Sequence, residues 1–377
     1  MGEWQTGWMR AIADVSAFET SVEDVTLRMS VVSGLSGESV RLELSNRFGA
    51  TSLMVGSCVL AAGGRSAEAL FDGRPEVEIA PGESRWTDPA SLTVERDGDV
   101  RIDLYLPETT MHSTGNYSRT SVGVSAPGNF AGLDDFGTTE LPMLPAPDGS
   151  ELPSPVPFLR RLEVQAAPPE MVVACLGDSI TAGGWPEVAA AALEGEVDLV
   201  MLNLGIAGNR LRVDPAPEIA SFGLSGVSRF SEDVCATSGV TDVVIALGTN
   251  DIGLPGAAAP ASDLPAADQI IDAYRRLIVE AQNANINVTI ATITPFIGAE
   301  GIDSNRDAIR NGVNDWIRTS APNFVDFDQA VRSEAHPDRL AEEFDSGDHL
   351  HPNETGTQRL GRAMANEIAR RRGLELG

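Results

Sequence analysis

Residues 171–181 read Met-Val-Val-Ala-Cys-Leu-Gly-Asp-Ser-Ile-Thr, so a short apolar run ends abruptly in a glycine, an aspartate and a serine. An uninterrupted apolar run of this length is typical of a strand covered on both faces, as in a parallel sheet. Four further runs of the same kind follow, at 199–204, 243–247, 288–293 and 324–327. The second half of the chain is therefore predicted to hold a parallel sheet of five strands.

Segments with helical spacing lie between these runs. One helix is predicted over 266–281, where the apolar residues share one face. A second is predicted over 304–317, where Ser304 and Asp307 have the spacing of a capping box, and the last over 355–372. Strands that alternate with helices predict an α/β fold, a flavodoxin-like doubly wound sheet with its reactive groups on loops after the strands.

The first half of the chain has the alternation of half-buried strands. Residues 100–106 alternate apolar and polar side chains, similar runs occur at 40–44 and 53–60, and glycine or proline clusters separate them. This pattern predicts an antiparallel β-sandwich of jelly-roll-like type. A proline-dense connector without regular pairing should follow, with prolines at 142, 145, 147, 153, 155 and 157. We expect two domains, residues 1–167 with the connector included and residues 168–377.

The composition excludes several kinds of partner. Because 55 acidic residues stand against 27 basic ones, the formal charge of −28 repels nucleic-acid phosphates and anionic lipids. Every basic residue is arginine, which a GC-rich coding bias and a salt-adapted surface would both explain. No apolar run approaches the ~20 residues of a membrane span, and the first ten residues lack the pattern of a signal peptide. We expect no nucleic-acid or membrane partner, and a cytoplasmic protein unless a leader for secretion has been removed.

Ser179 stands in the turn that follows the first strand of the predicted parallel sheet. There its hydroxyl can face a cleft at the edge of the sheet, while its amide lies at the N-terminus of a helix. Ser179 is therefore the candidate nucleophile. A serine that merely caps the helix is the alternative.

Two later loops supply candidate hydrogen-bond donors. In the segment 203–210, Gly208 allows a backbone amide to approach a ligand closely, and in 247–251 the side chain of Asn250 can donate through Nδ2. Together with the Ser179 amide, these groups predict an oxyanion hole of three donors. An ordinary turn glycine and an asparagine bonded to its own backbone are the alternatives.

The segment 348–352, Asp-His-Leu-His-Pro, carries the candidate base and its carboxylate. His351 would take the proton of Ser179, while Asp348 would orient the other ring nitrogen. His349 is a competing imidazole in the same loop. Three further residues are predicted to line the pocket: Asp178, Trp185 and Arg210. The alternatives are a packed indole for Trp185 and a solvated guanidinium for Arg210.

Two histidines so close together also suggest a metal site, because imidazole is a common metal ligand. A third ligand at suitable spacing is not apparent, and His112 and His336 stand in unrelated contexts. The three cysteines are widely separated and form neither a disulfide framework nor a zinc-type pair. We therefore predict no metal and no cofactor.

Taken together, the four loops resemble the SGNH hydrolases, also called the GDSL esterase and lipase family, which are named after a serine, a glycine, an asparagine and a histidine. The residues at these positions are Ser179, Gly208, Asn250 and His351, with Asp348 as the acid. The resemblance extends from 172 to about 372 and implies the family's esterase or lipase activity. The first half also resembles the β-rich front domain of a two-domain subgroup.

The predicted function is a serine esterase that hydrolyses carboxylic esters through an acyl-serine intermediate. A short acyl group on a sugar or small alcohol is favoured, because no long apolar insertion suggests a lid over a lipid. Two alternatives remain, an acyltransferase that uses the same acyl-enzyme and a carbohydrate-binding or interaction protein with an inactive hydrolase domain. The expected partner is a small-molecule or carbohydrate ester, and the oligomeric state is left open.

Overall fold

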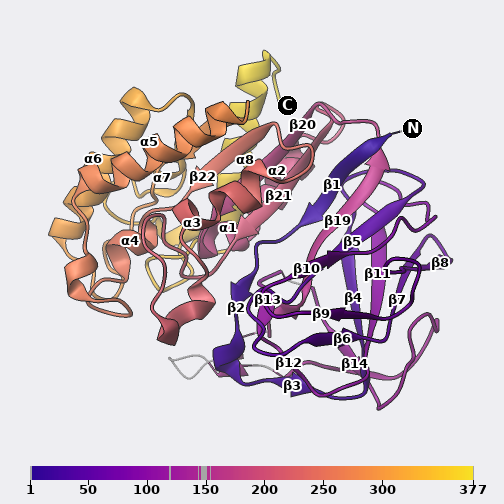
Figure 1. Cartoon of the computed structure of the whole chain (residues 1–377). Helices are drawn as coiled ribbons and strands as arrows, with labels where there is room; N and C mark the ends of the chain where they lie inside the picture. Colours follow the sequence, from indigo (N-terminus) through magenta and orange to yellow (C-terminus); the bar gives the residue numbers. More distant parts are fainter. Residues whose placement is uncertain (1, 119, 143, 146–150, 153, 377) are drawn as a thin grey trace. The chain divides into compact units, whose positions relative to one another are not determined.

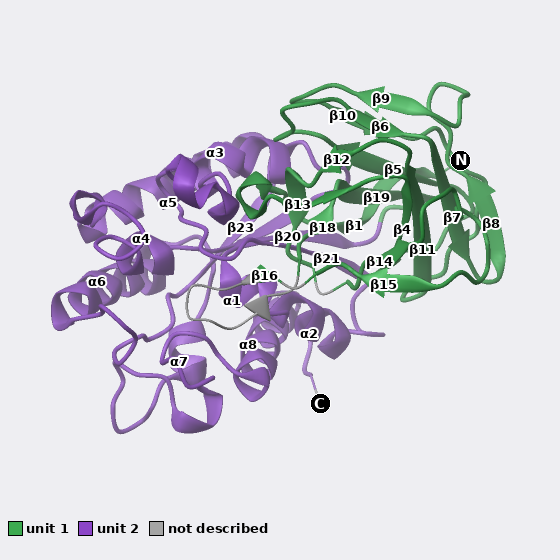
Figure 2. Cartoon of the chain, turned by 90° about the horizontal axis from the view of Figure 1, so that it is seen from below, with its two compact units in different colours: residues 1–168 green, residues 169–377 purple. Residues whose placement is uncertain are grey.

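The computed structural model describes residues 2–118, 120–142, 144–145, 151–152 and 154–376. The chain divides into two compact units, Met1–Pro168 and Pro169–Gly377 (Figure 2). Of the predicted connector, Pro147 and Pro153 lie outside the described residues. Two of its other prolines do take part in pairing, because Pro145 and Pro157 each end a strand of two residues.

The C-terminal unit contains a sheet of five parallel strands in the order β21-β20-β22-β23-β24, of which Figure 1 labels β20, β21 and β22. The strands are β20 (Met171–Gly177), β21 (Leu199–Gly205), β22 (Asp242–Ala246), β23 (Asn287–Ala291) and β24 (Phe324–Val325). The first strand of this sheet in the chain is thus its second strand in space, as in flavodoxin-like folds, and the predicted fold class is confirmed. Loops after β20 and its two neighbours meet at the edge where such folds bind ligands.

Helices cover both faces of this sheet. On one face, apolar side chains of α2 (Trp185–Ala192), α7 (Phe327–Val331) and α8 (Glu354–Arg372) pack with Val173 and Cys175 of β20. The alternate residues of β20 are also fully buried, and α5 (Ala267–Asn283) packs on β23 and on α6 (Ser304–Ser320). The shorter helical elements of this unit are α1 (Ser179–Ala182), η2 (Pro217–Phe222), α3 (Gly226–Phe230), η3 (Ser231–Cys235), α4 (Thr249–Gly253), η4 (Ala261–Asp263) and η5 (Glu342–Phe344).

Local sequence explains where several of these elements begin. The carboxylate of Asp303 accepts a hydrogen bond from the Arg306 amide, so Asp303 caps α6 and the predicted capping box at Ser304 is wrong by one residue. Asn353 caps α8 in the same way through the Gly356 amide. The predicted strand 324–327 is shorter than expected, because α7 already begins at Phe327.

The N-terminal unit is built of antiparallel sheets, as predicted. One has the order β1 (Glu3–Met9), β19 (Leu159–Ala166), β5 (Val40–Ser45) and β10 (Ser84–Trp86). The other has the order β15 (Thr138–Glu140), β14 (Gly123–Ser125), β4 (Val25–Val32), β11 (Asp99–Leu106), β7 (Ser57–Ala62) and β8 (Arg65–Glu68). The smaller elements are β2 (Ala13–Asp14), η1 (Ser16–Phe18), β3 (Ser21–Val22), β6 (Leu53–Val55), β9 (Val77–Ile79), β12 (Thr110–Met111), β13 (Thr114–Asn116), β16 (Leu144–Pro145), β17 (Glu151–Leu152) and β18 (Val156–Pro157).

Strand β11 shows how the alternation works in this unit. Its apolar residues, Val100 to Leu106 at every second position, are fully buried in the core. Asp103 points to the opposite face but is also buried, because Arg28 of the neighbouring strand pairs with it at 2.7 Å.

Within the described ranges of the chain, no helix combines the length and the apolar character that crossing a bilayer requires.

Candidate active site

The turn after β20 presents Ser179 at the edge of the sheet. Asp178 is extended, and its carboxylate accepts a hydrogen bond of 3.0 Å from the Ile180 amide, which caps α1. Ser179 is the first residue of that helix, so its amide has no acceptor within the helix. A side chain at Gly177 would collide with Thr181, because a Cβ atom there would lie 1.9 Å from the threonine hydroxyl. The turn therefore requires the glycine before Asp178.

Three predicted residues form a hydrogen-bonded relay. The hydroxyl of Ser179 lies 2.8 Å from Nε2 of His351, and Nδ1 of His351 lies 2.6 Å from a carboxylate oxygen of Asp348. The other carboxylate oxygen of Asp348 accepts hydrogen bonds from the amides of Leu350 and His351. Partial burial alone would raise the pKa of the Asp348 carboxyl, but the amide and ring hydrogen bonds of His351 and the Leu350 amide outweigh it and lower the pKa to about 2. Asp348 is therefore ionised at neutral pH, as a carboxylate that orients the imidazole must be.

The two other predicted oxyanion donors stand in neighbouring loops. Gly208 has a φ of 75°, and a Cβ atom there would lie 2.5 Å from the ring of Phe222, so only glycine fits. Asn250 is buried at the start of α4, and its Nδ2 donates to the backbone carbonyl of Asn209 at 3.1 Å. Because an amide nitrogen carries two hydrogens, this bond fixes the side chain and leaves one donor. The oxyanion hole itself stays a prediction.

Two residues predicted for the pocket are buried and have partners within the protein. Trp185 is fully buried, packs edge-on against Phe327 and donates through its indole nitrogen to Thr181 at 3.1 Å. Arg210 is buried too and is therefore not a solvated guanidinium, because it pairs with Asp263 at 3.0 Å and donates to the Asp214 carbonyl. Both side chains are thus held by contacts within the protein, and their place in a substrate pocket stays a prediction.

His349 has its own carboxylate, which the sequence analysis missed. Its Nδ1 lies 2.6 Å from Asp345, four residues earlier, and its ring packs over Gly298. Its backbone has a φ of 63°, which turns the residue away from the path that a regular helix or strand would take. The loop thus carries two separate histidine–aspartate pairs. In the part of the chain that the structure describes, no three histidine, cysteine or acidic side chains are grouped as metal ligands.

Asp251 is a second residue that sequence reasoning passed over, although it stands in the segment 247–251. Its buried carboxylate accepts hydrogen bonds from the amides of Leu211 at 2.6 Å and Arg212 at 3.0 Å. Burial raises the pKa of Asp251 to about 6, against the lowering effect of these two amides. Asp251 therefore ties the loop that carries Asn250 to the loop that carries Gly208.

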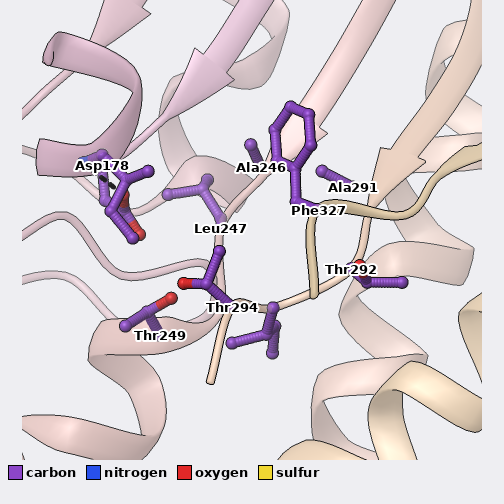
Figure 3. Close-up of a pocket in the computed structure, with 10 residues that line it drawn as sticks. Asp178, Ala246, Leu247, Thr249, Ala291, Thr292, Thr294 and Phe327 are labelled. Carbon is purple, nitrogen blue, oxygen red and sulfur yellow. Dashed lines mark hydrogen bonds between the residues drawn. The ribbon is translucent and has the colours of Figure 1, made fainter. Parts of the chain in front are cut away.

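A small pocket borders these loops at the carboxyl ends of β22 and β23 (Figure 3). Its lining includes Asp178 and Ile180, on either side of Ser179, and Thr249, which precedes Asn250. The other lining residues belong to strand ends, the following loops and α7: Ala246, Leu247, Ala291, Thr292, Ile293, Thr294 and Phe327. The pocket is thus adjacent in sequence to both the candidate nucleophile and a candidate oxyanion donor.

The charge of Asp178 predicts a pH-dependent stability. Burial raises its pKa to about 7, although the Ile180 amide and nearby His351 act in the opposite direction. A carboxyl whose folded pKa lies above its unfolded value of about 3.9 stabilises the fold at low pH, and this contribution is lost as the pH rises towards 7. Asp178→Asn keeps the cap on α1 and has no charge. The free energy of unfolding of Asp178→Asn minus that of wild type should therefore increase by about 3 kcal/mol between pH 5 and pH 8.

Urea unfolding of both proteins at these two pH values, followed by circular dichroism, measures that difference. The Glu354→Gln variant is the control, because it also exchanges a carboxyl for an amide, at an exposed residue in the first turn of α8. An equal pH dependence in wild type and Asp178→Asn would show that Asp178 is ionised in the fold throughout.

Comparison with known proteins gives the family. Residues 175–359 match the model of the GDSL-like lipase/acylhydrolase family, which covers most of the C-terminal unit. The C-terminal unit is similar to this family, and the predicted resemblance to SGNH hydrolases is confirmed. It is accordingly a carboxylic ester hydrolase.

Solved structures similar to part of the chain were also found. An acetylxylan esterase of Geobacillus stearothermophilus is 20% identical over 53% of this chain and 94% of its own, with a TM-score of 0.42. A carbohydrate acetylesterase of Sinorhizobium meliloti is 16% identical over 53% of this chain and 99% of its own, with a TM-score of 0.41. A GDSL-like lipase of Bacteroides thetaiotaomicron is 20% identical over 54% and 89%, with a TM-score of 0.39. The search of curated proteins found no match.

Proposed function

We propose that this protein is a serine esterase that removes short acyl groups from a sugar or another small alcohol through an acyl-Ser179 intermediate. The observation that carries the proposal is the relay in which Ser179 Oγ lies 2.8 Å from His351 Nε2 and His351 Nδ1 lies 2.6 Å from Asp348. Both distances are within hydrogen-bond reach, as general-base activation of a hydroxyl requires.

In acylation, Oγ of Ser179 attacks the ester carbonyl carbon while Nε2 of His351 takes the hydroxyl proton. The carbonyl oxygen becomes an anion that the amides of Ser179 and Gly208 and the side chain of Asn250 stabilise. When the tetrahedral intermediate collapses, the bond to the alcohol oxygen breaks and His351 gives its proton to the leaving alcohol. Water then attacks the acyl-serine with His351 as base again, and the carboxylic acid and the free serine are released.

The preference for a short acyl group is supported by a small pocket whose lining includes Asp178 and Ile180, the two chain neighbours of Ser179. The pocket is lined by Ile180, by Thr249 and Phe327 (Figure 3), and by the last residues of β22 and β23. An acetyl group adds only one methyl to the carbonyl carbon, whereas each further methylene needs additional room among packed side chains. A long acyl chain would have to lie outside this pocket.

A series of p-nitrophenyl esters from acetate to decanoate tests this proposal. We expect kcat/KM to be highest for acetate or propionate and to fall steadily as the chain lengthens. Mass spectrometry of the protein quenched during turnover should find the acyl group on Ser179. The highest kcat/KM at octanoate or decanoate would contradict the short-acyl preference, and an enzyme without any acylated serine would contradict the mechanism.

A further inference from the structure

Arg229 is hydrogen-bonded to loops of the candidate active site, although nothing in the reaction above uses it. It belongs to α3, and only 4% of its side chain is exposed. Nη2 of its guanidinium donates to the carbonyl of Gly177 at 3.0 Å. Nε and Nη2 both donate to Oδ1 of Asn209, at 3.2 and 3.0 Å, and Nη1 pairs with Asp233 at 3.1 Å. One planar group thus contacts two of the loops that carry predicted site residues.

Asn209 extends these contacts to the third loop. Its backbone carbonyl accepts the hydrogen bond from Nδ2 of Asn250 at 3.1 Å. Its side-chain nitrogen Nδ2 donates to the backbone carbonyls of Phe222 at 2.7 Å and Leu224 at 2.9 Å. The ring of Phe222 is the group that packs against Gly208. A displacement of Asn209 would therefore move the Asn250 side chain and the Gly208 loop together.

Each of the three predicted oxyanion donors is linked to the hydrogen bonds of Arg229 and Asn209. Two of the donors are near these residues or their partners in sequence, and the third is hydrogen-bonded to Asn209. Gly177 is two residues before Ser179, Gly208 is directly before Asn209, and Asn250 is bonded to the Asn209 carbonyl. The guanidinium is suited to this position because its rigid fork can donate in several fixed directions at once. Asp233, on the following turn η3, supplies the opposite charge that a buried arginine needs.

We infer that Arg229 is a positioning residue, which holds the three donors of the oxyanion hole at one mutual geometry without touching the substrate. The inference rests on the proposed function. An oxyanion donor is effective only at hydrogen-bond distance from the anion of the transition state, so small shifts of the loops lower kcat more than they change KM.

The test is the Arg229→Lys variant, which keeps a positive charge and removes the fork. Active sites are titrated with a p-nitrophenyl alkylphosphonate that labels Ser179, so that kcat refers only to folded, reactive protein. We expect kcat for p-nitrophenyl acetate per titrated site to fall roughly 10- to 100-fold, with less than about a threefold change in KM. The affinity for a trifluoromethyl ketone, which forms a charged tetrahedral adduct, should fall by the same factor as kcat/KM.

Arg318→Lys is the matched control. Arg318 also pairs through its guanidinium with two carboxylates, Asp326 and Asp328, but it lies on α6 and takes no part in the network. The Arg318→Lys variant should have a lower thermal stability than wild type and the same kcat per titrated site. A second variant, Asn209→Ser, breaks the same contact from the other side, and the double variant should be no slower than the slower single one.

The outcomes are separable from those of the proposed function. If the wild-type protein neither hydrolyses the acetate nor is labelled at Ser179, the proposed function has failed. If wild type is active and both Arg229→Lys and Asn209→Ser turn over normally per titrated site, Arg229 stabilises the fold alone and the inference is overturned. A loss of kcat in Arg318→Lys equal to that in Arg229→Lys would overturn it as well.

Discussion

Replacing Ser179 with alanine is expected to lower kcat for p-nitrophenyl acetate by about 10⁶-fold. The reason is that the Ser179 hydroxyl is the group placed 2.8 Å from the imidazole, and without it no acyl-enzyme forms. The oxyanion donors remain in the variant, so a residual acceleration of about 10³ over water is the upper limit. Steady-state rates at high enzyme concentration measure both quantities.

Ser304→Ala is the control for this substitution. Ser304, like Ser179, is the first residue of a helix, but it is exposed and distant in sequence from every loop of the candidate site. It should leave kcat unchanged. Both variants should have the circular dichroism spectrum and the unfolding midpoint of wild type within about 2 °C. Activity of Ser179→Ala above a tenth of the wild-type value would mean that another group is the nucleophile.

The sequence predicted the parallel sheet well because its central strands β20 and β22 are buried on both faces. Met171 to Gly177 has no polar side chain until Asp178, and such a run leaves little choice but an interior strand. The predicted site followed from the same fact, since residues after parallel strands must meet at one edge. Ser179 and His351 are 172 residues apart in the chain and lie 2.8 Å apart in the fold.

Side-chain direction, in contrast, was not predictable from the sequence. Trp185 follows the nucleophile loop closely, yet its ring packs edge-on against Phe327, far along the chain. Arg210 is held by Asp263 in the same way. Arg229 gave no signal at all, because an arginine on a short helix is ordinarily exposed and its partners Gly177 and Asn209 stand in other segments. Contacts of this kind depend on tertiary packing rather than on local pattern.

His351→Ala is expected to lower kcat by about as much as Ser179→Ala, on the order of 10⁶-fold, because members of such a relay act as a unit. His349→Ala should lower it less than about 10-fold. The two residues are matched controls for each other, since they stand two positions apart in one loop and each ring is bonded to its own aspartate at 2.6 Å. The measurement is kcat with p-nitrophenyl acetate for both single variants. It is repeated for the double variant that combines Ser179→Ala with His351→Ala.

The geometry decides between the two imidazoles. The ring of His351 directs Nδ1 to Asp348 and Nε2 to the serine hydroxyl, so a proton can pass from Ser179 to a base whose other nitrogen is already fixed. The ring of His349 is directed to Asp345 and packs over Gly298, and the positive φ of its backbone holds it there. The combined variant should be no slower than either single one, because the second substitution removes a group that has lost its partner. A larger loss in His349→Ala than in His351→Ala would assign the base to His349 and require the loop to rearrange before reaction.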